Sequence, residues 1–411
     1  MRGAGVRKEV CMGLKHRSLL VLLAISAVAA LLPGPVAAAP TVSLVSWGFD
    51  SPRGIAFMGR TAYVAEAGHG SNSAAGCLPN GGPCIGDTSQ ISKLNTTTGN
   101  HTPLATGFFS IALNPVERIG VSGLSVRNGK IYAQIGATSR EVPASFAIGQ
   151  QAGDLIAVNP SNGSWTTIAQ VGDDNFDYTL PFTQPDPATC GQCPGTQEHD
   201  ANPTGVLATS NGWYVADSGA NTLTKVSRNG KTKVVAYFPW RNPNLTMFPS
   251  DEVPTCVAST DEALWIGTLA GHLFRFEEGK VTQVTPTDAS GNQLLSHVTG
   301  CTSRGEGTLY LVNMFGPGTF GDQAFVNGSV VKYNTETGKG SVLADAFHNA
   351  SLFLPYMPSF GPDGNLYVTA GAVCDLAGDN PFQGAPFNPC MVGNKKGGRV
   401  VKITINSGEH D

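Results

Sequence analysis

Short apolar runs separated by turn-forming residues recur along most of this chain. The clearest example lies at 203–226, where apolar runs of four to six residues are interrupted at Asn211-Gly212 and at Asp217-Ser218-Gly219. Runs of this length between such turns predict strand, turn, strand, turn, strand. The same pattern returns through the rest of the chain, so we expect one repeated β-sheet unit to organise it.

Six copies of this unit can be aligned on an aromatic residue in the second strand of each copy. The aromatic residues are Tyr63, Tyr132, Tyr214, Trp265, Tyr310 and Tyr367. A third strand follows the second in every copy, and in the first five copies a Gly-containing turn then introduces a fourth. Four-stranded units repeated at such intervals indicate a β-propeller, and six copies predict an all-β, six-bladed ring.

The two ends of the repeat predict how the ring closes. The last copy ends after its third strand at Ile405, and Thr41–Val45 has the pattern of the missing fourth strand. We therefore expect Val42–Val45 to pair with Val400–Ile405, which leaves no open sheet edge. The blades are predicted near 50–107, 118–172, 200–239, 251–286, 296–346, and 353–405 together with 41–46.

Residues 1–39 have the composition of a secretory signal peptide. Basic residues precede an apolar run at Leu19–Leu32, and Ala37–Ala39 provide small residues for cleavage. The run has 14 residues, fewer than the roughly 20 that span a bilayer. The formal net charge of −4 indicates no basic surface for nucleic acid or anionic membrane. We expect 40–411 to be a secreted, extracellular, monomeric propeller without a membrane span.

Eight cysteines follow the signal peptide, an even number that suits an oxidising compartment. Proximity predicts three local disulfides, and the remaining two cysteines occupy equivalent positions in neighbouring copies. The expected pairs are Cys77–Cys84, Cys190–Cys193, Cys374–Cys390 and Cys256–Cys301. The Cys-Gly-Gln-Cys spacing at 190–193 resembles a redox motif, but its Pro-rich context favours a structural disulfide.

Six Asn-x-Ser/Thr sequons are compatible with a glycoprotein. They begin at Asn95, Asn100, Asn162, Asn244, Asn327 and Asn349.

Long insertions are confined to particular connections of the repeat. They lie between the second and third strands of copies one, two, five and six, and between copies two and three at 172–202. In a propeller these connections emerge on one face, and the short turns emerge on the other. Long loops held by disulfides on a rigid scaffold favour a binding face, although loops that only cover the core have the same pattern.

Polar residues at repeat-equivalent positions suggest a site at the mouth of the central channel on that face. The candidate metal ligands are Asp50, Glu66, Asp217, Glu252 and His297, and further polar candidates are Asp200, Asn202 and Asn313. Carboxylates with Asn and His around one axis can hold Ca²⁺ or a similar divalent ion. The structural alternative is that the carboxylates bond backbone amides of the following turns.

Two stretches carry a resemblance to a known family. Pro52-Arg-Gly-Ile-Ala-Phe with Tyr63-Val-Ala-Glu-Ala-Gly is one, and Asp200-Ala-Asn-Pro-Thr-Gly-Val with Val-Ala-Asp217-Ser-Gly-Ala-Asn is the other. Together with Cys77, Cys84 and the strand that follows, they resemble the ScyD/ScyE family of secreted proteins across nearly all of 41–405. The resemblance implies no catalytic residues. More distantly, the unit resembles NHL repeats and the strictosidine-synthase and gluconolactonase propellers, of which the gluconolactonase type implies a divalent ion at the channel mouth.

Two functions therefore remain open. The first is non-catalytic binding or scaffolding of a small molecule, extracellular protein or glycan by the loop face and channel mouth. The second is a metal-assisted hydrolase or lactonase. The sequence shows no Gly-x-Ser-x-Gly elbow, no His-Glu-x-x-His and no phosphate-binding loop, so it assigns no catalytic residue.

Overall fold

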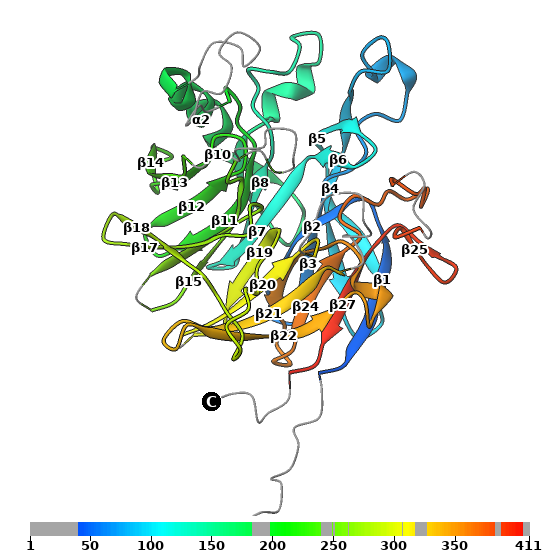
Figure 1. Ribbon diagram of the computed structural model, residues 1–411. Coiled ribbons are helices and arrows are strands. Elements are labelled where there is room, and N and C mark those ends of the chain that lie inside the picture. The colour runs from blue at the N-terminus through cyan, green and yellow to red at the C-terminus, as the bar shows by residue number, and fades with distance from the viewer. Residues whose placement is uncertain are drawn as a thin grey trace, which may run out of the picture. The chain divides into compact units, whose positions relative to one another are not determined.

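A computed structural model describes the fold of this chain (Figure 1). The described residues are 40–182, 198–239, 249, 251–261, 263–305, 307–316, 327–382 and 388–405. The predicted signal peptide, Cys190, Cys193 and Asn244 lie outside them. No helix among the described residues is long and apolar enough to span a membrane.

Among the described residues, six antiparallel sheets of four or five strands follow one another in sequence order, which confirms the predicted propeller. Blade 1 contains β2 (Pro52–Met58), β3 (Thr61–Glu66), β4 (Cys84–Asn95), β5 (His101–Asn114) and a short fifth strand, β6 (Glu117–Ile119). Blade 2 contains β7 (Val121–Arg127), β8 (Lys130–Ile135), β9 (Asp154–Val158) and β10 (Trp165–Gln170). Blade 3 contains β11 (Pro203–Thr209), β12 (Gly212–Asp217), β13 (Thr222–Val226) and β14 (Thr232–Tyr237).

The remaining blades repeat the same plan. Blade 4 contains β15 (Pro254–Ser259), β16 (Leu264–Thr268), β17 (Leu273–Glu277) and β18 (Lys280–Val284). Blade 5 contains β19 (Val298–Ser303), β20 (Thr308–Asn313), β21 (Ser329–Asn334) and β22 (Lys339–Asp345). Blade 6 contains β23 (Pro355–Phe360), β24 (Leu366–Ala370), β27 (Gly398–Ile403) and β1 (Val42–Phe49).

The ring closes as the sequence predicts. Strand β1 is the outer strand of blade 6 and pairs antiparallel with β27, with Val42 opposite Ile403 and Leu44 opposite Val401. The N–H of Thr404 also donates to the carbonyl of Thr41 at 2.9 Å. The last blade is therefore completed from both ends of the described chain.

The first strand of each blade lies against the first strand of the next, around the central channel. Glycine permits this close approach. A Cβ on Gly123 of β7 would stand 2.4 Å from the Thr204 carbonyl oxygen of β11, which is closer than a side chain tolerates. The glycine of the repeat is thus a packing requirement between blades.

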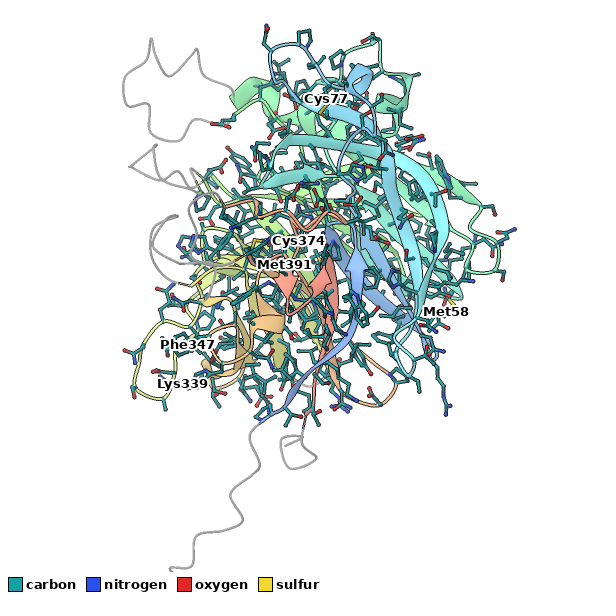
Figure 2. All side chains as sticks on the ribbon, turned by 90° about the vertical axis from the view of Figure 1, so that its right-hand side faces the viewer. Met58, Cys77, Lys339, Phe347, Cys374 and Met391 are labelled. Carbon is teal, nitrogen blue, oxygen red and sulfur yellow. A yellow bond between two sulfur atoms is a disulfide. The ribbon has the colours of Figure 1, made fainter. Side chains whose placement is uncertain are left out.

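The elaborated connections and the short turns lie on opposite faces. Figure 1 shows α2 (Val171–Thr179) and the loop that carries η2 (Ala74–Gly76) at the top of the view, while β1 and β27 run to the bottom. Figure 2 shows Cys77 at the top and Met58, next to a short turn, far below it. We call the face with the long connections the loop face. Smaller elements in the connections are η3 (Ala147–Gln151), η4 (Leu180–Phe182), η6 (Ala350–Leu352) and the hairpin β25 (Met391–Val392) with β26 (Lys395–Lys396).

The described cysteines form three of the predicted disulfides: Cys77–Cys84, Cys256–Cys301 and Cys374–Cys390. Disulfides of this kind are typical of an oxidising, non-cytoplasmic compartment.

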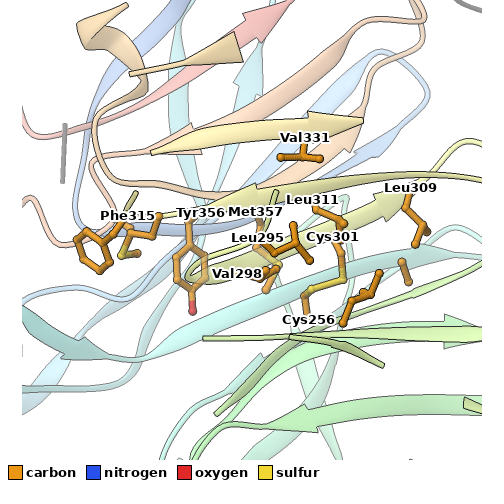
Figure 3. Close-up of a cluster of buried hydrophobic side chains, with 14 of the residues drawn as sticks. Cys256, Leu295, Val298, Cys301, Leu309, Leu311, Phe315, Val331, Tyr356 and Met357 are labelled. Carbon is orange, nitrogen blue, oxygen red and sulfur yellow. A yellow bond between two sulfur atoms is a disulfide. The ribbon is translucent and has the colours of Figure 1, made fainter. Parts of the chain in front are cut away.

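One correction concerns the alignment of blades 5 and 6. Their first hairpins hold one residue more than those of blades 1 to 4, because Val298 faces Asn313 whereas Pro254 faces Thr268. Cys301 therefore lies one position beyond the equivalent of Cys256. Side chains alternate between the two faces of a strand, so two cysteines at equivalent positions of neighbouring blades would point in the same direction around the ring. The offset of one residue lets the sulfur of Cys301 face the sulfur of Cys256. Figure 3 shows the resulting bridge between the two first strands.

Candidate channel-mouth binding site

A cavity of about 610 Å³ opens at the loop-face end of the central channel. All six blades contribute to its wall. Apolar side chains dominate it, and they are Val116, Ile119, Val253, Leu269, Met314, Phe315, Tyr356, Val373 and Phe382. Figure 3 shows Phe315 and Tyr356 in the left part of a buried cluster of side chains, and the Cys256–Cys301 disulfide in its right part. A cavity of this size, with an apolar wall and few polar groups, suits a small organic molecule.

The second residue of each first strand lines this cavity. These residues are Arg53, Ser122, Thr204, Thr255, Thr299 and Tyr356. We call them the inner ring. In blades 1, 2, 3 and 5 the next residue is a glycine at which the neighbouring first strand approaches closely. The repeat thus places one side chain per blade at the same position of the first strand.

Most hydroxyls of the inner ring serve the scaffold. The Thr255 hydroxyl donates to the Val298 carbonyl at 2.7 Å, and the Thr299 hydroxyl donates to the Pro355 carbonyl at 3.2 Å. The Thr204 hydroxyl bonds to the Ser218 hydroxyl of its own blade at 2.8 Å, and it also donates to the Thr255 carbonyl of blade 4 at 3.3 Å. These bonds tie one blade to the next, and they leave the hydroxyls with limited capacity to bind a ligand.

Two arginines supply the cationic groups of the wall. Arg118 of β6 pairs with Asp375, with 2.9 Å between Nη2 and Oδ2. Arg53 of β2 donates from Nη2 to the Arg118 carbonyl at 2.7 Å, and its guanidinium lies 4.6 Å from the centre of the Tyr356 ring. The exposed Glu117 lies at the same cavity and accepts a hydrogen bond from Asn114.

Of the eight polar residues that the sequence predicts for the channel mouth, Asn202 lines this cavity. Three of the others, Glu66, Asp217 and Asn313, bond the linkers that enter their own blades. Glu66 accepts from the Asp50 N–H at 2.7 Å, and Asp217 accepts from the Asn202 N–H at 2.7 Å. Asn313 likewise accepts from the Ser296 N–H at 3.2 Å. The last residue of the second strand thus bonds the chain as it enters three different blades. This agrees with the structural alternative, in which these side chains bond backbone amides.

Burial sets the protonation of the anchoring carboxyls. It raises the pKa of Glu66 to about 7, against hydrogen bonds from the Asp50 N–H, Ser92 and Gln90 that lower it. It also raises the pKa of Asp217 to about 6, although Ala220, Asn175 and Asn202 donate hydrogen bonds to that carboxylate. The cost of removing a carboxylate from water outweighs these bonds.

Two further carboxylates orient histidines that the sequence analysis did not single out. Asp50 Oδ2 lies 2.5 Å from His69 Nδ1, and this hydrogen bond raises the pKa of His69. Glu252 lies 2.9 Å from His272 Nδ1 and also accepts from the Thr268 hydroxyl. Their signal in the sequence is a histidine in the loop just after the second strand of blades 1 and 4.

Asp200 and His297 occupy different surroundings. Burial raises the pKa of Asp200, whose carboxyl shares a hydrogen bond with Glu141, and it raises the pKa of Glu141 to about 8. Burial lowers the pKa of His297, whose Nδ1 has no hydrogen-bond partner among the described residues. The extra residue in blade 5 makes Ser296, rather than His297, the equivalent of Asp50.

The predicted ring of metal ligands is not assembled in this arrangement. Within the described part of the chain, no three His, Cys, Asp or Glu side chains form a group that could hold a metal ion. The physical reason is that each carboxylate is committed to a backbone amide, a hydroxyl or a histidine of its own blade.

We therefore expect a strong chelator to leave the melting temperature of the purified protein unchanged at neutral pH. Differential scanning fluorimetry with and without EDTA, together with elemental analysis, measures this. A lower melting temperature that Ca²⁺ restores would instead support the sequence-based metal hypothesis, because an ion bound to the folded state stabilises it by mass action.

Four of the six sequon asparagines are exposed: Asn95, Asn100, Asn162 and Asn327. Asn349 is half-buried, and its Nδ2 donates to the Val42 carbonyl at 3.3 Å. Glycosylation stays a prediction for these sites.

Three solved structures illustrate what this chain is similar to. A protein of unknown function from Bacteroides thetaiotaomicron is 10% identical over 89% of this chain and 76% of its own, with a TM-score of 0.54. A luciferin-regenerating enzyme is 11% identical over 90% and 96%, with a TM-score of 0.49. A gluconolactonase from Xanthomonas campestris is 8% identical over 89% of each chain, with a TM-score of 0.47. No family model matches the sequence, and no curated protein matches it.

Identities this low show a shared fold alone. The six-bladed architecture rests on the sheets of this chain, and the likeness to propellers of the gluconolactonase and NHL kind stays a prediction. Membership of the ScyD/ScyE family stays a prediction.

Proposed function

We propose that this protein is a secreted, non-catalytic β-propeller that binds a small organic molecule in the channel-mouth cavity. The observation that carries the proposal is the cavity of about 610 Å³, with an apolar wall to which every blade contributes. Cavities in this size range bury most of a small ligand. A rigid ring with disulfide-linked loops holds the wall in place, and this lowers the entropic cost of binding.

The hydrogen bonds that the polar groups already make favour non-catalytic binding over hydrolysis. The hydroxyls of Thr204, Thr255 and Thr299 are bonded to carbonyls of neighbouring blades, and the nearby carboxylates are bonded to linker amides. A metal-assisted lactonase needs a group of free ligands at the mouth, and Asp50, Glu66, Asp217, Glu252 and His297 do not form one within the described ranges.

Secretion and kinship with the ScyD/ScyE family belong to the same proposal. The signal-peptide pattern at 1–39 supports secretion, as do the three disulfides. The two resembling stretches, which start at Pro52 and Asp200, support the kinship. A monomer is expected, because the blades of a closed propeller leave only short outer edges through which strands of another chain could pair.

Titration with 1-naphthylacetate tests the binding function. We expect saturable binding with one molecule per chain. Leu269→Trp should weaken it at least tenfold, because Leu269 lines the cavity and a larger side chain takes up its volume. Val342→Trp is the matched control, since Val342 is 49% exposed on β22 and outside the cavity.

Isothermal titration calorimetry provides the affinity and the stoichiometry. Failure to bind either 1-naphthylacetate or its neutral amide would contradict the proposed function. Equal weakening by both tryptophan variants would place the binding outside the channel mouth. Hydrolysis of an added lactone that depends on a divalent ion would favour the enzyme alternative.

A further inference from the structure

Blade 1 departs from the other blades at the inner ring. The equivalent positions of blades 2 to 5 hold small hydroxyl side chains, from Ser122 to Thr299, and blade 6 holds Tyr356. Blade 1 places Arg53 there, 9% exposed and on the wall of the cavity. The repeat thus brings a single buried cation to a position that elsewhere serves packing between blades.

The positive charge of Arg53 is not balanced by the groups around it. Asp375 pairs with Arg118, and Glu117 is exposed and bonded to Asn114. Among the described residues Arg53 has no ion pair, and its Nε has no hydrogen-bond partner. Its two contacts are the Arg118 carbonyl, which Nη2 reaches, and the face of the Tyr356 ring.

A buried guanidinium without a counter-ion is costly to the folded state. Its remaining donors lie at a cavity whose other strong donors are committed, because the threonine hydroxyls of the inner ring donate to backbone carbonyls. An anionic group of a ligand would provide the missing charge. Arginine is well suited to this role, since its planar donors match the two oxygens of a carboxylate.

We propose that the ligand of the channel-mouth cavity is an organic anion, with an apolar body and one carboxylate or similar oxyanion bound by Arg53. The apolar body lies against Val253, Leu269 and Phe315 on the opposite blades. This inference rests on the proposed binding function and adds the chemical class of the ligand and the residue that selects it.

The test compares 1-naphthylacetate with 1-naphthylacetamide, which has nearly the same shape and no charge. The wild-type protein should bind the acid at least tenfold more tightly than the amide at pH 7.5 and low salt. Arg53→Gln should bring the two affinities within about twofold of each other, mainly by weakening the binding of the acid. Arg127→Gln, at an exposed position of β7, is the control for loss of one positive charge.

The possible outcomes separate this inference from the proposed function. Equal affinity of the wild-type protein for acid and amide would overturn the anion inference and leave the binding function standing. Binding of neither compound would overturn both. A preference for the acid that persists in Arg53→Gln would overturn the role of Arg53. The comparison of acid with amide uses wild-type protein, so it stands even if the variant does not fold.

Discussion

Replacing both Cys256 and Cys301 with alanine is expected to lower the free energy of unfolding by about 4 kcal/mol, the value that the chain-entropy model assigns to a loop of this length. The two cysteines are separated by 45 residues, and their disulfide links β15 to β19. Both lie at the channel, where they are 1% and 7% exposed. The bridge thus joins two neighbouring blades at their first strands, where the ring has no other covalent link among the described residues.

The matched control is the Cys77→Ala, Cys84→Ala pair. That disulfide spans 7 residues within one loop of blade 1, and the same model predicts a loss of about 2 kcal/mol. Urea unfolding followed by tryptophan fluorescence gives both values. A loss from the Cys256–Cys301 pair no larger than that of the control would contradict the view that this disulfide holds the ring together.

The contribution of Glu66 to the free energy of unfolding is expected to fall as the pH rises from about 4.5 to about 7. The pKa of Glu66 rises from 4.5 to about 7 on folding, because burial disfavours its charge. Between these values the folded protein keeps a proton that the unfolded chain releases, so the folded state loses stability with rising pH. A pKa shift of this size lowers the free energy of unfolding by about 3 kcal/mol. The full loss is reached above pH 7, and below pH 4.5 there is no loss. Asp217, whose pKa burial raises from 3.8 to about 6, acts in the same direction.

Glu66→Gln measures this contribution, because glutamine has nearly the same shape and does not ionise. The free energy of unfolding of the variant should fall less steeply than that of the wild-type protein between pH 4.5 and 7. Any constant cost of mismatched hydrogen bonds would shift the whole curve without changing this difference. Glu336→Gln, at an exposed turn, is the control. Parallel curves for Glu66→Gln and the wild-type protein would contradict the assigned burial cost.

The sequence predicts the fold well because the repeat constrains it at every level. The alternation of short apolar runs with Gly-containing turns locates the strands, and the missing fourth strand of the last copy predicts the pairing of Val42–Val45 with Val400–Ile405. The repeat could not show that the first hairpins of blades 5 and 6 hold one extra residue. The copies are aligned on the aromatic residue of the second strand, and a longer hairpin leaves the pattern around that residue unchanged.

The site was harder to predict. Residues such as Glu66 and Asp217 attract attention as carboxylates at a channel, yet burial and backbone amides commit them to the linkers. The residues that do line the cavity are less conspicuous types, such as Thr204 and Thr255, one position before the packing glycine or its equivalent. Their shared place in the repeat was visible in the sequence. The cavity itself depends on loops that the repeat does not determine, including the segment at Val116–Ile119.

A crystal structure of the mature protein with 1-naphthylacetate tests the proposed binding site directly. We expect electron density for one molecule in the channel-mouth cavity, with its carboxylate against Arg53 and its rings among Val253, Leu269 and Phe315. Density for the ligand elsewhere on the propeller, with the cavity filled by water alone, would contradict the proposed site.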